Sequence, residues 1–298
     1  MRWIWIGFLA TAVLAAEMSK EEREAYQAWY DANAAQDWPK AIEAAKVYRD
    51  SFPQGEYAEY LKNWDRRLRL QFFKDSVKSK DTNEVIKRGT ELLAEDPNDL
   101  YVIYKIATTL RENEIWAKPP VFTHAGEEAA FALKAAGLIE AGQVPAGVDQ
   151  SKWHKEAELG ALYQTLALIE KNNKNTDQAI EYYTKAATAD PSNPNNALSA
   201  GILSYTKYQE AARKYRETKD ASAKDEADRR ADAAIASYTQ FLKATEGNAS
   251  FADQRAKVEK GLADAQKFRT PEPPSAPATP TPPRPPESQA TPPASTTP

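Results

Sequence analysis

The chain has 298 residues, enough for one or two domains, and its 11 glycines against 28% charged residues favour helix over sheet. Its 39 basic and 43 acidic residues give a net charge of −4 without a basic block, so nucleic acid is not expected as the main partner. Cysteine is absent, which excludes disulfides, thiolate metal sites, a cysteine nucleophile and a lipid-anchoring cysteine.

The N-terminal residues form an apolar run from Trp3 to Ala16, preceded by a single arginine. The run is shorter than the ~20 residues of an ordinary membrane span, and Ala15-Ala16 suits a signal-peptidase site. We therefore expect residues 1–16 to be a signal peptide, so that the chain is exported, periplasmic or secreted, with no stable membrane span after cleavage. The alternative is an uncleaved N-terminal segment that tethers the chain to the membrane.

Three segments share one spacing of small, aromatic or aliphatic residues, at offsets of four and seven from the first core position, followed by a proline at offset twelve. Asp37, Asp81 and Asn175 begin the three segments and are typical helix N-caps, and the residue before each proline disfavours helix. The spacing predicts an amphipathic helix in each segment. The residues concerned are Ala41, Ala45, Tyr48 and Pro53; Val85, Gly89, Leu92 and Pro97; and Ala179, Tyr183, Ala186 and Pro191.

A second helix is predicted before the third segment, in "GALYQTLALIEKN" (160–172), and completes a 34-residue unit that ends at Asn193. This unit resembles the tetratricopeptide repeat (TPR) family, whose pattern is a large residue, Leu and a small residue, then after a turn Ala, an aromatic residue, Ala and Pro. Glu170 departs from the pattern, since a tyrosine is usual there. The resemblance implies an all-α fold, a right-handed α-α superhelix.

The other units depart further from the repeat. Ala41 and Val85 are 44 residues apart, ten more than the family period, and a long helix over 56–80 accounts for the excess. The unit that starts at 99 is interrupted by "EIWAKPPVFTH", and residues 250–268 predict a final amphipathic helix that caps the array. We expect about five helix pairs and a capping helix over residues 17–269.

Residues 270–298 predict a disordered tail rich in Pro, Thr and Ala. Twelve of the 20 prolines lie in 271–298, which has no Leu, Ile, Val or aromatic residue with which to form a core. Such a composition favours extended polyproline II structure. The stretch "PPRPP" around Arg284 is a candidate ligand for an aromatic-lined groove, and a spacer across a cell-envelope layer is the other interpretation.

No residue set predicts catalysis, a cofactor or a metal site. The chain lacks GxSxG, HExxH and a phosphate-binding glycine-rich loop, and its two histidines, His124 and His154, share no ligand spacing and suit capping or surface roles. We therefore expect a non-enzymatic protein. A hydrolase built from carboxylates brought together by folding stays open and requires buried, facing acids.

The TPR resemblance implies a concave groove, lined by the first helix of each pair, that binds a protein or peptide partner. The sequence thus predicts an interaction scaffold or adaptor of the cell envelope. It makes no prediction of the oligomeric state. The alternative is a small-molecule or glycan binding module with a pocket near the interrupted third repeat, lined by Trp116 and Phe122. The candidate groove residues are Tyr26, Tyr30, Arg67, Lys74, Tyr104, Arg111, Gln164, Lys171, Asn172, Asn195 and Tyr205.

Overall fold

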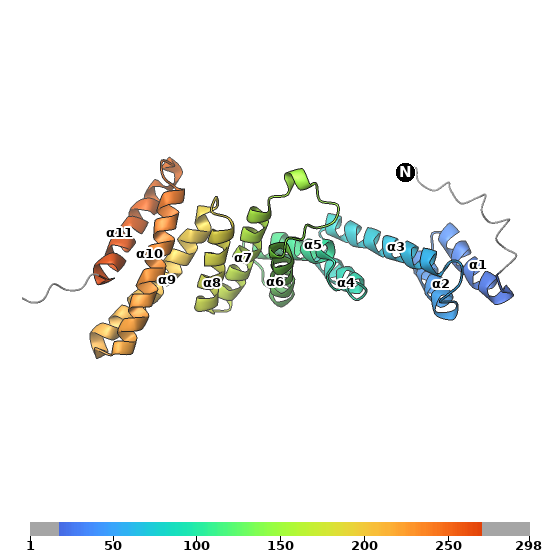
Figure 1. Ribbon diagram of the computed structural model, residues 1–298, viewed down its shortest axis with the longest axis horizontal. Coiled ribbons are helices and arrows are strands. Elements are labelled where there is room, and N and C mark those ends of the chain that lie inside the picture. Colours follow the sequence, from blue (N-terminus) through green and yellow to red (C-terminus); the bar gives the residue numbers. More distant parts are fainter. Residues whose placement is uncertain (1–17, 270–298) are drawn as a thin grey trace, which may run out of the picture.

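The computed structural model describes residues 18–269, which form eleven α-helices and no strand. The helices pack in five neighbouring pairs, α1 with α2 through α9 with α10, and α11 packs on α10 (Figure 1). The all-α, TPR-like arrangement with a final capping helix is confirmed, whereas the predicted signal peptide and tail lie outside the described residues. The helices are α1 (Lys20–Ala34), α2 (Trp38–Ser51), α3 (Ala58–Ser79), α4 (Thr82–Leu93), α5 (Leu100–Leu110), α6 (Ala125–Glu140), α7 (Lys155–Asn172), α8 (Thr176–Ala189), α9 (Pro194–Thr218), α10 (Ala221–Ala244) and α11 (Ala252–Arg269).

The second helix of three pairs begins and ends where the repeated spacing predicts. Asp37 caps α2 by accepting from the Lys40 N–H at 3.3 Å, and Asp81 caps α4 by accepting from the Glu84 N–H at 3.1 Å. Asn175 is the N-cap residue of α8, although its side chain makes no capping bond. All three helices end before their proline, so local sequence sets the length of each repeat unit.

The predicted core positions of these helices are buried, and the small residues among them allow close helix contacts. A Cβ atom added at Gly89 of α4 would lie 2.5 Å from Ile106 Cδ1 of α5 and 3.1 Å from Phe73 Cε2 of α3. Only glycine therefore fits where these three helices meet. The other buried core positions are Ala41, Ala45, Tyr48, Val85, Leu92, Ala179, Tyr183 and Ala186.

Helix α3 is longer than a repeat helix and links the first helix pair to the α4 and α5 region (Figure 1). Its 22 residues account for the ten extra residues between the first two repeat units. Leu61 at one end packs with α1 and α2, and Phe73 near the other end packs with α4 and α5. The first helix pair is thereby joined to the rest of the chain mainly through this one helix.

The predicted interruption of the third repeat begins inside a helix. After Leu110 the backbone continues as one π-helical turn, Arg111–Ile115, and then runs irregularly to α6. The Val121 N–H donates to the Glu114 carbonyl at 3.0 Å, which folds the irregular segment back on the π-helix. Such π-helical turns are rare and are frequent at functional sites.

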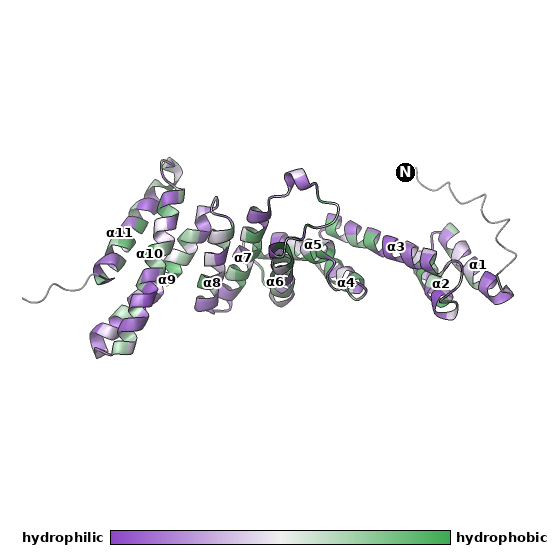
Figure 2. Cartoon of the chain, in the orientation of Figure 1, coloured by the Kyte–Doolittle hydropathy of each residue, from purple (hydrophilic) through white to green (hydrophobic). Residues whose placement is uncertain are grey.

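Helix α11 covers the end of the array and presents a polar outer surface. Val258, Gly261 and Ala265 are its buried residues, and Figure 2 shows the rest of the helix to be largely hydrophilic. This pattern suits a solenoid cap, because the last helix has no further repeat to cover it. Within residues 18–269, no helix combines the length and apolar character needed to span a membrane.

Candidate functional site

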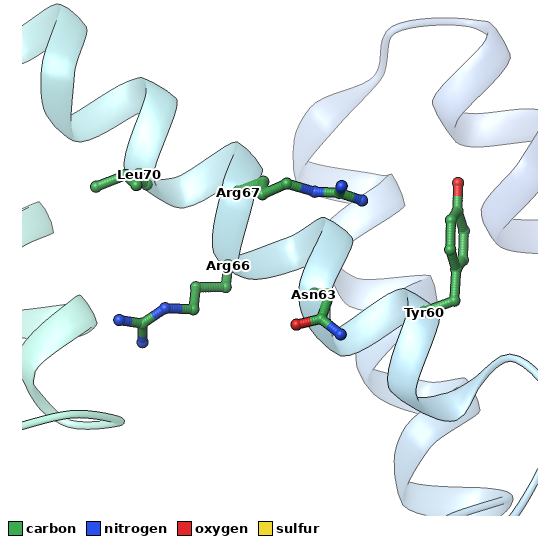
Figure 3. A pocket seen from close by; sticks show the side chains of 5 residues that line it. All are labelled: Tyr60, Asn63, Arg66, Arg67 and Leu70. Carbon is green, nitrogen blue, oxygen red and sulfur yellow. The ribbon is translucent and has the colours of Figure 1, made fainter. Parts of the chain in front are cut away.

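The exposed face of α3 carries a hollow of about 430 Å³ (Figure 3). Tyr60, Asn63 and Arg67 follow an i, i+3, i+7 spacing, which places them on one side of the helix, away from the buried Leu61 and Phe73. Of the lining residues only Arg67 was predicted from the sequence. The lining residues are Tyr60, Asn63, Arg66, Arg67 and Leu70.

The two neighbouring arginines of the hollow have different electrostatic roles. Arg66 extends away from Tyr60 and binds the start of α5, with Nη2 2.9 Å from Asp99 Oδ2 and Nη1 3.7 Å from Glu95 Oε2 (Figure 3). Arg67 extends toward Tyr60, is exposed, and makes no ion pair with any residue in 18–269. The hollow therefore presents one uncompensated cation beside an aromatic ring.

A buried ion cluster fixes the rotation of α3 and so keeps this face exposed. Asp65, only 1% exposed, accepts from Arg49 Nη2 of α2 at 3.0 Å and from Arg69 Nε at 2.8 Å. The carboxylate lies on the buried side of α3 and is bound from two directions. Sites built on helices held in this way are more precise than sites on loops.

An aromatic surface adjoins the hollow, between α1 and α3. Trp29 lies at its centre, with its ring at 85° to Tyr60 and at 84° to Trp64, and with ring centroids 5.7 and 5.3 Å apart. Tyr26 stacks on Tyr57 with centroids 4.1 Å apart. We name this surface the aromatic shelf; it consists of Tyr26, Trp29, Tyr30, Tyr57, Tyr60 and Trp64.

The structure thus brings three of the predicted groove residues, Tyr26, Tyr30 and Arg67, to the shelf and hollow, and distributes the others along the chain. The Tyr205 hydroxyl donates to Asp264 Oδ2 at 2.9 Å, so this ring links α9 to α11. Among the remaining predicted residues, Lys74, Lys171, Asn172 and Asn195 are exposed, Gln164 and Tyr205 are half-buried, and Tyr104 and Arg111 are buried.

A second hollow, of about 610 Å³, lies at the turn between α7 and α8. Its lining is polar and includes Asp177, which forms an ion pair of 2.6 Å with Arg230 of α10. Lys171 and Asn172 lie close by in sequence, but neither lines this hollow. The lining residues are Glu170, Lys174, Asn175, Thr176, Asp177, Gln178, Tyr182 and Lys207.

A cluster of buried charged residues surrounds the π-helical turn. Arg111 is 6% exposed, lies 4.6 Å from the Trp116 ring centroid, and has Nη1 4.0 Å from Glu158 Oε2 of α7. Glu114 accepts from the His124 backbone N–H at 3.0 Å and lies 2.5 Å from His124 Nδ1. The π-helical turn aims these side chains into the interior between α5, α6 and α7.

Glu128 is the least compensated member of this cluster. It is fully buried, and neither carboxylate oxygen has a hydrogen-bond partner within residues 18–269. Burial raises the pKa of Glu128 to about 8, with Glu114 adding to the increase and Arg111 opposing it. Glu128 therefore stays protonated in the folded chain at neutral pH.

The hydrolase hypothesis requires buried, facing carboxylates, and Glu114 and Glu128 are buried near one another. Glu114 is already bound to His124, and neither acid lines either of the two hollows.

The second histidine, His154, is the exposed N-cap residue of α7. In residues 18–269 no three or more histidine or acidic side chains are arranged to hold a metal ion.

Of the two residues predicted to line a pocket, Trp116 is 42% exposed with Arg111 over its ring, and Phe122 is half-buried in the irregular segment. Neither residue lines either hollow described above. The predicted ligand pocket at the interrupted repeat stays a prediction.

The sequence-based prediction missed Tyr60, Asn63, Arg66 and Leu70 of the α3 hollow, although the helical spacing of Tyr60, Asn63 and Leu70 with Arg67 was available as a signal. It also missed Glu128. This residue falls on the buried stripe of α6 with Ala132, Ala135 and Ala136, so an acid at a core position was readable from the sequence.

No protein-family model and no curated protein matches the chain. Among solved structures, the chain is similar to a TPR repeats protein from Bacteroides fragilis, with 15% identity, a TM-score of 0.42, and 84% of this chain and 100% of that chain covered. MamA shows 14% identity, a TM-score of 0.37 and coverage of 79% and 97%. A thermophilic TPR protein from Thermus thermophilus shows 15% identity, a TM-score of 0.27 and coverage of 81% and 99%.

The assignment of the fold rests on the chain's own helices. Three helices carry the predicted core residues, cap residues and terminal prolines, and consecutive helices pack in pairs along the array. The repeat spacing and the packing it produces agree over the described residues. The chain therefore has a tetratricopeptide-repeat-like fold.

Proposed function

We propose that the chain is a non-enzymatic interaction scaffold that binds an extended segment of a protein partner along the exposed face of α3. The observation that carries the proposal is the α3 hollow, in which Tyr60, 47% exposed, lies beside Arg67, a cation without an ion-pair partner in residues 18–269. Tyrosine and arginine are enriched among the residues that dominate binding energy at protein interfaces. The sequence predicted a peptide-binding groove along the first helices of all pairs, and the proposal places the binding site on the exposed face of α3.

The chemistry of the hollow suits a peptide with at least one acidic group. Arg67 offers a guanidinium group for a carboxylate, and the Tyr60 ring offers apolar contact area. The Asn63 side-chain amide donates to Glu59 Oε1 at 3.1 Å and keeps its carbonyl oxygen for a peptide N–H group. These three groups lie along about two turns of a helix that the Asp65 cluster holds in place.

The proposal includes an exported location at the cell envelope, and this part rests on the apolar run of residues 3–16. Cell fractionation followed by mass spectrometry of the N-terminus tests it. A mature chain that begins at Glu17 supports export with cleavage, whereas a full-length chain in the cytosolic fraction contradicts it.

Site-specific photo-crosslinking in the native cells tests the binding face. A photoreactive residue at Asn63 is expected to yield defined protein adducts, and one at the exposed Glu91 of α4 serves as the control position. Tyr60→Ala and Arg67→Ala should each weaken binding of the captured partner by ~30-fold or more, as expected when a dominant interface residue is truncated. Arg213→Ala, an exposed arginine on α9, should leave binding unchanged.

Two outcomes would contradict the proposal. One is a set of adducts that is the same at Asn63 and at Glu91. The other is a small molecule that co-purifies with the chain and is lost in the Tyr60 variant while no protein is captured.

A further inference from the structure

We propose that the aromatic shelf and the α3 hollow bind the proline-rich segment 271–298 of a second copy of the chain. The inference rests on the proposed function, because it names the partner of the same helix face. Three properties of the described residues support this docking: the exposed aromatic rings, a buried N–H donor without a partner, and two charges without ion-pair partners.

The shelf presents aromatic rings directly beside the α3 hollow. Trp29 meets Tyr60 and Trp64 edge to face, and the Tyr60 ring also lines the hollow. Tyr30 and Tyr60 are 37% and 47% exposed, so both rings offer accessible apolar surface to a ligand. Proline-rich strands bind to surfaces lined by aromatic side chains, because their polyproline II structure is already formed before binding.

The centre of the shelf also lacks a hydrogen-bond acceptor. Trp29 is 3% exposed, and its Nε1–H has no partner within the described residues. A buried donor without an acceptor is destabilising, so an acceptor from a ligand would be favourable there. Polyproline II strands make no internal hydrogen bonds and keep their carbonyl oxygens available.

Two opposite charges without ion-pair partners in residues 18–269 flank the shelf. Glu56 is exposed. The pKa of Tyr57 is raised first by burial of its own hydroxyl and second by the negative charge of Glu56, so the Glu56 carboxylate lies close to the Tyr57 ring. Arg67 is the uncompensated cation of the hollow. Glu56 lies in the turn before α3, and Arg67 is nine residues after Ala58, which at ~1.5 Å per residue places it about 14 Å beyond the start of the helix.

The proline-rich segment carries a matching pair of opposite charges. Arg284 and Glu287 are three residues apart in "PPRPPES". In a polyproline II strand of three residues per turn and ~3.1 Å per residue, they lie on one face about 9 Å apart. Long side chains span the remaining distance, so that Arg284 pairs with Glu56 and Glu287 pairs with Arg67.

The arrangement of the helices favours docking between two copies. In Figure 1 the shelf helices α1 and α3 lie toward one end of the array, and α11, after which the proline-rich segment follows, lies at the other end. A segment from one copy that docks on the shelf of the next makes a head-to-tail contact, and repetition of this contact extends an assembly.

A labelled synthetic peptide of residues 277–290, titrated into the full-length chain and followed by fluorescence anisotropy, tests the docking. We expect saturable binding that Tyr60→Ala weakens by ~10-fold or more, as truncation of an interface aromatic does. A scrambled peptide of the same composition should not bind, and Arg213→Ala should bind as the wild type does. Circular dichroism of each variant verifies that it is folded.

Charge reversal tests the pairing itself. The peptide with Arg284→Glu and Glu287→Arg should bind the wild-type chain more weakly than the native peptide does, and should regain affinity for the chain with Glu56→Arg and Arg67→Glu. A gain of this kind requires direct contact between the paired charges, because loss of folding in a variant lowers affinity and does not restore it.

Sedimentation velocity of the full chain tests the between-copy arrangement. Association should increase with concentration and decrease in Tyr60→Ala. A chain that stays monomeric while the peptide binds indicates docking within one copy and overturns the between-copy form. If the peptide does not bind at all while Asn63 still crosslinks to another protein, the inference fails and the proposed function stands. If the peptide does not bind and Asn63 crosslinks to no protein, both the docking inference and the proposed function are overturned.

Discussion

Replacement of Glu128 by Gln removes a buried ionisable group and keeps its shape, which makes it the most direct probe of the charged cluster. The pKa of Glu128 is about 8 in the folded chain, against 4.5 as its ordinary value. The unfolded chain therefore releases this proton near pH 4.5, whereas the folded chain holds it until near pH 8. Stability from this group is fully present below the unfolded pKa and is lost as pH rises toward the folded pKa.

The size of the effect follows from the same two values. Each pKa unit corresponds to about 1.4 kcal/mol, and the group titrates only partly at the two ends of the range, so between about pH 5 and about pH 8 the wild type loses about 3–4 kcal/mol of unfolding free energy through Glu128. Glu128→Gln has no proton to hold and escapes this loss. The difference in stability between the variant and the wild type should therefore grow by about 3–4 kcal/mol over this range.

Urea unfolding at the two pH values, followed by circular dichroism, measures this difference. All other titrations cancel, because the same groups are present in both chains. Glu127→Gln is the matched control, since this neighbouring side chain is exposed, and its effect should change by less than ~0.5 kcal/mol between the two pH values. A Glu128→Gln effect that is equal at both values would refute the reasoning, because it would mean that Glu128 ionises at an ordinary pKa inside the folded chain.

Two further predictions concern packing around α3 and α4. Asp65→Ala should destabilise the chain by about 2 kcal/mol in urea unfolding. This is less than for a fully buried ion pair, because Arg49 and Arg69 stay 23% and 25% exposed. An unchanged urea midpoint of unfolding would contradict the prediction. Gly89→Ala should lower stability by about 1–3 kcal/mol through overpacking against Ile106. Gly137→Ala, which meets nothing within 4 Å, should instead raise stability by up to ~1 kcal/mol, and equal shifts in the two glycine variants would contradict the packing argument.

The sequence predicted the repeat architecture because the information for it is local. An N-cap, two or three small or aromatic residues at helical spacing and a terminal proline determine where a helix begins, which face is buried and where it ends. Tyr48, Leu92 and Tyr183 are buried as this pattern predicts. Helix pairing then follows from short turns between amphipathic helices, so the fold needed no long-range information.

The exposure of individual groove candidates was not predictable in the same way. Tyr104 lies on the first helix of its pair, where the TPR resemblance implies an open position. Trp153, from the irregular segment before α7, covers it with ring centroids 5.5 Å apart, and Glu158 of α7 lies near its hydroxyl. Burial raises the pKa of Tyr104, and the Glu158 carboxylate adds to the increase. These contacts join residues about fifty positions apart, and no local spacing encodes them.

The aromatic shelf shows the same limit, since its rings come from residues 26–30 and 57–64 and meet only after α2 has folded back between them. Its location nevertheless agrees with a feature that the sequence does encode, the excess length between the first two repeat units. About ten additional residues extend α3 by roughly 15 Å. On this longer helix Asn63 and Arg67 are exposed and line the α3 hollow. The departure from the repeat period and the candidate interaction surface thus fall on the same helix, so the irregular spacing marks in the sequence the helix that the repeat pattern itself does not single out.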